Sequence, residues 1–133
     1  MKILAFDTSA KTASVFQKLA EEQNGFDILV VAAQFGLRHR GRSVRRVREI
    51  LLGNEFGLGA FAVGIMLLAY PELLAHYDDL WIDCAGDEFA PDADGDFSES
   101  PIFYFDDDRL WFSTYDVSYA SEDCGSVSGF LPL

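Results

Sequence analysis

The feature that most constrains the fold of this chain is the stretch from Asp78 to Asp108, in which carboxylates are interleaved with large apolar residues. No Lys or Arg occurs between Arg48 and Arg109, so these acids have no cation close to them in the sequence. Apolar side chains need a core, whereas ionised carboxylates need water or a partner. The stretch therefore predicts a folded segment with a concentrated negative surface. Its apolar members are Leu80, Trp81, Ile82, Phe89, Phe97, Ile102, Phe103, Tyr104 and Phe105.

Length and composition favour a single domain spanning residues 1–133. A chain of this length can bury a core without crosslinks, and a hydrophobic content of 50% is too high for intrinsic disorder. Two cysteines, Cys84 and Cys124, are too few for a disulfide framework, although the sequence allows one bridge between them.

The sequence predicts a soluble, cytoplasmic protein that does not bind membranes. The apolar, uncharged run at residues 56–70 contains three glycines and is shorter than the roughly 20 residues that a spanning helix needs. Asp7 interrupts the apolar segment that a signal peptide would require. The net charge of -12 repels anionic membranes and nucleic acid, so direct nucleic-acid binding is not expected.

The spacing of apolar and turn-forming residues predicts an α+β fold, with a mixed α/β arrangement as the alternative. Asp7, Thr8 and Ser9 are candidate caps for a first helix, and Ser43 is a candidate cap for a second. About four helices are expected to pack on a small sheet with a C-terminal β-hairpin. The predicted helices are 8–23, 43–52, 56–70 and 71–77, and the predicted strands are 2–6, 26–34, 80–84, 102–105 and 109–115.

Two segments are expected to be irregular. Residues 85–100 form an acidic loop that contains Gly86, Pro91 and Gly95. The segment from Val117 onward is rich in Ser and Gly, and it is expected to dock on the core through its last apolar residues, which are Phe130, Leu131 and Leu133.

The charges divide sharply along the chain. Residues 1–48 contain nine Lys or Arg against four Asp or Glu, whereas residues 49–133 contain 18 acids and only Arg109 as a base. The arginines between Arg38 and Arg48 resemble a nucleic-acid patch, but the large negative total favours internal or self-association pairing with the acidic half.

Motifs for metal binding and catalysis are incomplete. The stretch from Asp92 to Glu99 has the alternating aspartates of a calcium loop, but its glycine is displaced and Phe103 takes the final ligand position. A thiol site of Cys84 with His76 is opposed by nearby acids, which raise a thiol's pKa. His39, His76, Cys84 and Cys124 lack zinc-ligand spacing. No catalytic residue, cofactor or metal is therefore assigned.

The acidic surface itself is the main functional clue, because ordered carboxylates can occupy protein sites that normally bind phosphates. We expect a non-catalytic inhibitor that mimics nucleic acid and binds a basic protein or nucleoprotein complex. Phage or mobile-element anti-restriction and anti-CRISPR proteins act as inhibitors of this kind. Trp81, Phe89, Phe97 and Tyr104 would hold the surface rigid. The expected partner-binding residues are Asp78, Asp79, Asp87, Glu88, Asp92, Asp94, Asp96, Glu99, Asp106, Asp107 and Asp108.

The main alternative is a toxin-neutralising immunity protein that binds one basic enzyme. Carboxylates spaced like phosphates along a curved line would favour the mimic, whereas a compact patch around an exposed aromatic residue would favour the immunity protein. A Cys/His/Asp-centred enzyme and a calcium-binding protein are the less favoured third class.

Overall fold

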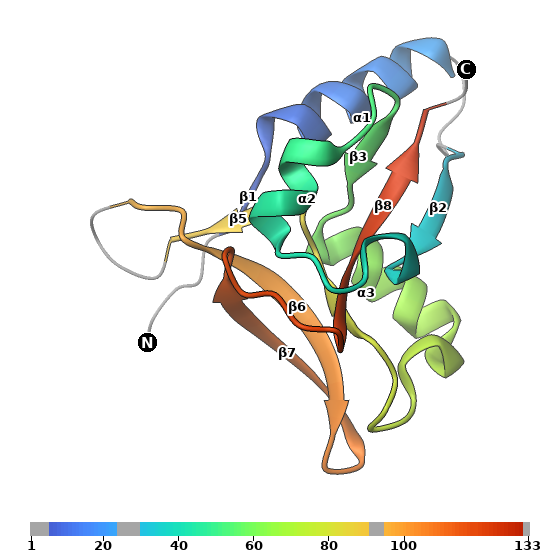
Figure 1. Ribbon diagram of the computed structural model, residues 1–133. Coiled ribbons are helices and arrows are strands. Elements are labelled where there is room, and N and C mark those ends of the chain that lie inside the picture. The colour runs from blue at the N-terminus through green and yellow to red at the C-terminus, as the bar shows by residue number, and fades with distance from the viewer. Residues whose placement is uncertain (1–5, 24–29, 91–94, 132–133) are drawn as a thin grey trace.

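The computed structural model describes residues 6–23, 30–90 and 95–131, which form an α+β fold (Figure 1). The described helices are α1 (Ala10–Glu22), α2 (Val44–Ile50) and α3 (Ala60–Ala69), with two short 3-10 helices, η1 (Leu37–His39) and η2 (Pro71–Leu74). The described strands are β1 (Phe6–Thr8), β2 (Ala32–Phe35), β3 (Glu55–Gly57), β4 (Trp81–Asp83), β5 (Asp87–Phe89), β6 (Glu99–Asp106), β7 (Arg109–Asp116) and β8 (Cys124–Phe130).

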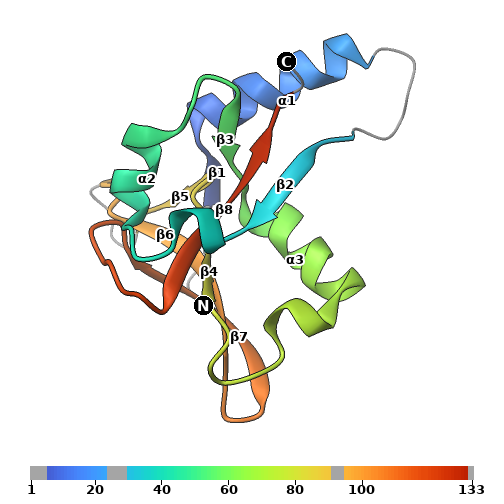
Figure 2. The same ribbon diagram turned by 45° about the vertical axis from the view of Figure 1, so that its right-hand side comes forward.

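The last strand, β8, links the sheet together. Its first half pairs in parallel with β4, and its second half lies between β2 and β3, antiparallel to both (Figure 2). Beyond β4 the order continues through β6 and β5 to β1. Strand β7 pairs with β6 along its whole length, and this hairpin extends to the end of the molecule opposite α1 (Figures 1 and 2).

The main core lies where α1 and α3 pack against the sheet. Leu19 of α1 and Val63 of α3 are completely buried there, together with Phe56 and Val127 from β3 and β8. A second, smaller cluster lies under α2 and consists of Val44, Val47, Ala85 and Val117.

Local sequence signals account for the ends of several elements. Ser9 caps α1 and Ser43 caps α2, since each side chain accepts a backbone N–H in the first turn of its helix. The β6–β7 turn contains Asp107 and Asp108, whose φ angles of 49° and 58° match a two-residue type I′ turn. Aspartate is one of the few residues that accept this left-handed conformation readily. The predicted caps and hairpin are therefore confirmed, although the hairpin is not the last element of the chain.

Several predicted elements differ in the structure. Strand β8 occupies the segment that was expected to be an irregular tail, β5 lies within the expected loop 85–100, and β3 takes the first two residues of the predicted helix 56–70, of which α3 forms the rest. Residues 71–77 form only the short turn η2. These strands are specified by pairing with distant segments, which local periodicity does not reveal. Most of the predicted strand 2–6, and residues 26–29 of the predicted strand 26–34, lie outside the described residues.

Gly125 allows β8 to approach the chain at Gly36, because a Cβ atom at Gly125 would collide with the Gly36 carbonyl oxygen. We expect Gly125→Ala to lower the free energy of unfolding by about 1–3 kcal/mol, as overpacking does in other cores. Urea unfolding monitored by circular dichroism measures this change. Gly53→Ala is the control, since no atom lies within 4 Å of a Cβ built there. An equal effect of the two substitutions would contradict the role of close packing at Gly125.

Candidate functional site

Five aromatic side chains form a continuous row on the sheet face opposite α1 and α3, in which four are stacked and the fifth packs edge-on. The ring centroids of Trp81 and Tyr104 are 4.3 Å apart, and Tyr104 and Trp111 continue the row at 6.3 Å. On the other side of Trp81, Tyr115 lies at 5.9 Å, and Tyr119 contacts Tyr115 edge-on at 5.4 Å. We call these five residues the aromatic row.

Strand register brings the row together. Tyr104 of β6 lies directly opposite Trp111 of β7, and the pairing of Ile82 with Phe103 sets Trp81 beside Tyr104. Because side chains alternate between the two faces of a strand, Ile82 and Phe103 enter the main core while the aromatic row faces outward. Cross-strand aromatic pairs of this kind stabilise a sheet and also form a rigid contact surface.

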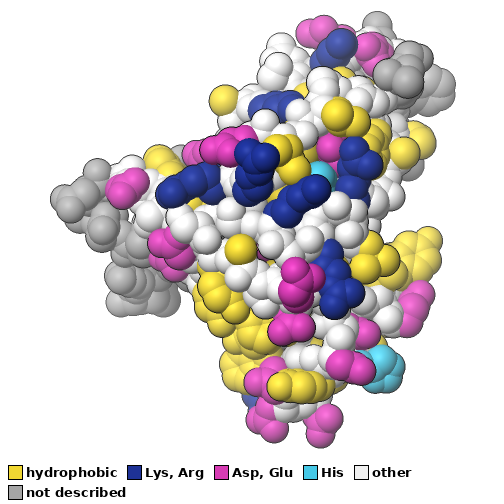
Figure 3. Space-filling view, in the orientation of Figure 1, with side chains coloured by type: hydrophobic (Ala, Val, Ile, Leu, Met, Phe, Trp, Pro, Cys, Tyr) yellow, Lys and Arg dark blue, Asp and Glu magenta, His cyan; other side chains and the backbone are white. Residues whose placement is uncertain are grey.

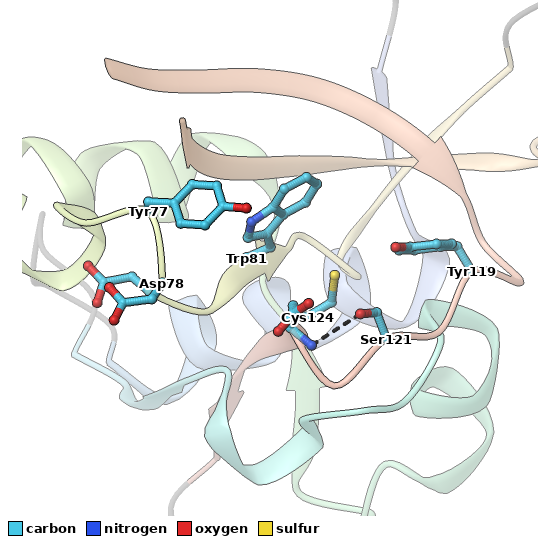
Figure 4. Close-up of a pocket in the computed structure, with 8 residues that line it drawn as sticks. Tyr77, Asp78, Trp81, Tyr119, Ser121 and Cys124 are labelled. Carbon is cyan, nitrogen blue, oxygen red and sulfur yellow. Dashed lines mark hydrogen bonds between the residues drawn. The ribbon is translucent and has the colours of Figure 1, made fainter. Parts of the chain in front are cut away.

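A cavity of about 210 Å³ opens beside Trp81 (Figure 4). Trp81 lies in the middle of the close-up, with Tyr77 on one side and Tyr119 and Ser121 on the other. We call this space the Trp81 cavity. Its aromatic lining is Tyr77, Trp81 and Tyr119, its carboxylates belong to Asp78, Asp79 and Asp123, and the remaining lining residues are Ser121 and Cys124.

The predicted carboxylates nearest to the aromatic row form two groups, one at the tip of the β6–β7 hairpin and one at the Trp81 cavity. Asp106, Asp107 and Asp108 are exposed at the tip of the β6–β7 hairpin, where the Trp111 indole N–H donates to the Asp106 carbonyl at 2.9 Å. Asp78 is exposed at the Trp81 cavity. Asp79 also lines the cavity, but it is half-buried and its carboxylate accepts the Ala75 and His76 N–H groups at 2.8 and 2.9 Å. Figure 3 shows acidic side chains gathered at the lower end of the molecule, where the hairpin tip lies.

Other predicted partner-binding residues contact the protein itself. The Asp87 carboxylate is buried and accepts the Ala60 N–H at 2.7 Å, which caps α3. Burial raises the pKa of Asp87, and the Ala60 hydrogen bond and Arg48 oppose that rise. Glu99 accepts a hydrogen bond from Thr114. Glu88 is half-buried, Asp96 is exposed, and Asp92 and Asp94 lie outside the described residues.

Four arginines donate hydrogen bonds to groups in the acidic half of the chain, which is the internal pairing that the sequence favoured. Figure 3 shows Lys and Arg side chains as a band across the middle of the molecule, separate from the acids at the lower end. The acceptors are Glu55 for Arg38, the Glu122 carbonyl for Arg40, Glu49 for Arg46, and the Ala85 and Asp87 carbonyls for Arg48.

Sequence reasoning missed several contributors to this surface. Trp111 and Tyr115 were assigned to a strand, but their shared face was not recognised, although their even spacing is the signal for it. Tyr119 and Asp123 reach the Trp81 cavity because β8 pairs with β4. Of the aromatic anchors predicted outside the row, Phe89 is buried and Phe97 is exposed.

The thiols of Cys84 and Cys124 are unsuited to thiolate chemistry, because burial and a nearby buried acid, Asp83, disfavour their ionisation. Burial raises the pKa of Asp83 to about 7. Burial, together with Asp83 and Asp123, raises the pKa of the Cys124 thiol to about 12, and burial also raises the pKa of Cys84. Both cysteines are free, and the described residues contain no group of three or more His, Cys, Asp or Glu side chains that could hold a metal ion.

The chain has no significant match to a protein-family model, to a curated protein or to a solved structure. Among the described residues, none of the helices has the length and apolar character needed to cross a membrane.

Proposed function

We propose that this chain is a non-catalytic binding protein that uses the aromatic row and its flanking carboxylates to bind a basic protein. The supporting observation is that rings and carboxylates share one surface, on which Trp111 and Tyr119 are 38% and 49% exposed. Buried Trp and Tyr side chains supply much of the binding energy in protein interfaces. Carboxylates around them attract a basic partner and accelerate its association.

The compact form of the surface favours a dedicated partner, as in a toxin-neutralising immunity protein. Its carboxylates form two groups beside the aromatic row, one at the hairpin tip and one at the Trp81 cavity, and the Asp87 carboxylate is buried against the Ala60 N–H. A duplex mimic instead requires carboxylates at phosphate-like spacing along the surface.

The second candidate is a nucleic-acid-mimicking inhibitor of the anti-restriction or anti-CRISPR type. Three consecutive exposed aspartates at the hairpin tip, residues 106–108, support it.

The proposal is tested by capturing partners from a host lysate at low salt and measuring their affinity for purified variants. We expect Asp107→Asn/Asp108→Asn to weaken binding about tenfold or more, because the interface loses two charges that a basic partner pairs with. Asparagine also accepts the left-handed conformation at these positions, so the hairpin is preserved. Binding of the parent protein should weaken steeply as salt is raised.

The control is Glu21→Gln/Glu22→Gln, which removes the same charge from exposed positions on α1 at the far end of the molecule (Figure 1). If the control weakens binding as much as the hairpin variant does, net charge and not this surface is responsible, and the proposal fails. Release of the captured partner by competing duplex DNA would favour the mimic, whereas retention would favour the immunity-type protein.

A further inference from the structure

We propose that the Trp81 cavity binds the guanidinium group of an arginine side chain supplied by the basic partner. This inference rests on the proposed function, since it names the group that anchors the partner. The cavity combines aromatic side chains from Tyr77, Trp81 and Tyr119 (Figure 4) with three acidic lining residues, Asp78, Asp79 and Asp123. Aromatic rings attract cations through their negative faces, and carboxylates pair with guanidinium through two parallel hydrogen bonds.

The size of the cavity suits a single side chain. Its volume of about 210 Å³ lies below the roughly 300–1,000 Å³ that is usual for drug-sized ligands. It nevertheless exceeds the space of a single water molecule several times over. An arginine brings an apolar stem that packs on aromatic rings and a planar cation that stacks on them.

A buried acid behind the cavity adds to the attraction for a cation when it is ionised. Trp81 and Cys124 line the cavity, and Asp83 and Ser126 follow them on the same faces of β4 and β8. Asp83 is only 5% exposed, and no Lys or Arg of the described residues forms an ion pair with it. The buried Ser126 hydroxyl has no hydrogen-bond partner within the described part of the chain.

The lining argues against other ligands. Asp78, Asp79 and Asp123 would repel a phosphate or a carboxylate. A metal ion needs several oxygens that converge on one point, and no such group occurs among the described residues. An organic cation with flat apolar faces can both stack on the aromatic rings and pair with the carboxylates.

The test is a titration of the ¹⁵N-labelled protein with Nα-acetyl-arginine N-methylamide at low ionic strength. The chain has two tryptophans, so the Trp81 indole signal is assigned by its loss in Trp81→Phe. We expect a saturable shift of this signal with a Kd on the order of 1 mM. The corresponding citrulline derivative has the same shape without the charge, and we expect no saturation with it.

Variants of the exposed lining residues separate binding from folding. Asp78→Asn/Asp123→Asn should weaken arginine binding about fivefold to tenfold, and Tyr77→Ala about twofold to fivefold. Tyr77 is 75% exposed, so its removal leaves the fold intact. Glu21→Gln/Glu22→Gln on α1 is the matched control that removes the same charge far from the cavity, and it should bind the arginine derivative as the parent does.

Equal shifts with arginine and citrulline, or unchanged arginine binding in Asp78→Asn/Asp123→Asn, would overturn the inference. The proposed function is judged separately by partner capture. A parent protein that captures its partner but does not bind the arginine derivative refutes the cavity alone. A protein that binds the derivative at Trp81, while the hairpin variant and the α1 control capture the partner equally well, refutes the proposed surface.

Discussion

Replacing Glu55 with alanine is expected to destabilise the protein by about 3–5 kcal/mol, the loss seen when one partner of a buried charged network is removed. Glu55 is fully buried in β3. Its Oε2 atom accepts hydrogen bonds from His39 Nε2 at 2.8 Å, from the Ser128 hydroxyl at 2.8 Å and from Arg38 Nε at 3.1 Å. The substitution leaves His39 and Ser128 buried without this acceptor, which is the reason for the large effect.

The Glu55 network joins three parts of the fold, since it connects β3 to η1 and to β8. Burial raises the pKa of Glu55, but the hydrogen bonds from His39, Ser128 and the Leu52 N–H, together with the proximity of His39, outweigh that effect, so the pKa lies below its ordinary value. The Arg42 guanidinium lies 3.2 Å from His39 Nδ1. Because a guanidinium can only donate, Nδ1 accepts, and the ring proton lies on Nε2, where it is donated to Glu55.

Urea unfolding of Glu55→Ala should show a lower midpoint with an unchanged slope. Glu49→Ala is the control, because Glu49 is exposed and forms an ion pair with Arg46 across one turn of α2. Surface pairs of this kind contribute about 0–1 kcal/mol. Similar midpoints for the two variants would show that the buried network is not a main source of stability.

Replacing Asp83 with asparagine should have the opposite sign and stabilise the protein at pH 8 by about 4 kcal/mol. Asp83 has a pKa of about 7 in the folded protein against an ordinary value of 3.8, and each unit corresponds to about 1.4 kcal/mol. The folded state therefore binds this proton more tightly than the unfolded chain does. Tighter binding of this proton stabilises the folded state fully below about pH 4, and this stabilisation is lost as the pH rises through 7.

Chemical unfolding between pH 4 and pH 8 measures this effect. The parent protein should lose stability from Asp83 across that range, whereas Asp83→Asn should lack this part of the pH dependence. Asp123→Asn is the control, since Asp123 is exposed near the same cavity. A variant with the same pH dependence as the parent would show that Asp83 is not held protonated by burial.

The two predictions bear on function in different ways. The Glu55 network fixes β8 against β3 and η1, and β8 in turn positions Cys124 beside Trp81. Asp83 is destabilising when ionised, and a cation in the Trp81 cavity would offset that penalty. A buried acid that lowers stability at neutral pH is therefore consistent with a binding role for the adjoining cavity.

Much of the local structure was predictable because its causes are local. Ser9 and Ser43 cap helices through their own hydroxyls, and the aspartates at 107 and 108 suit a tight hairpin turn. Strand β8 was not predictable in this way. Gly125, Ser126, Ser128 and Gly129 have low strand propensity, and their extended conformation depends on neighbouring strands on both sides.

In the candidate site, too, the residues whose placement has local causes were predictable from sequence, and those placed by distant contacts were not. Asp78 and the hairpin aspartates were identified from sequence, since their exposure follows from turns that the chain encodes locally. Asp87 was assigned to the surface, yet it caps α3, which starts 27 residues earlier in the chain. Only the tertiary structure distinguishes an acid at the surface from one that is used inside the fold.

The sequence by itself determined that this protein has an α+β fold, a capped first helix, an aspartate-tipped hairpin and a strong division of charge. Tertiary structure decided which carboxylates remain at the surface and which rings stack beside them. The reason is that capping and turn formation depend on a few consecutive residues, whereas the aromatic row and the Trp81 cavity depend on strand register between segments far apart in the chain.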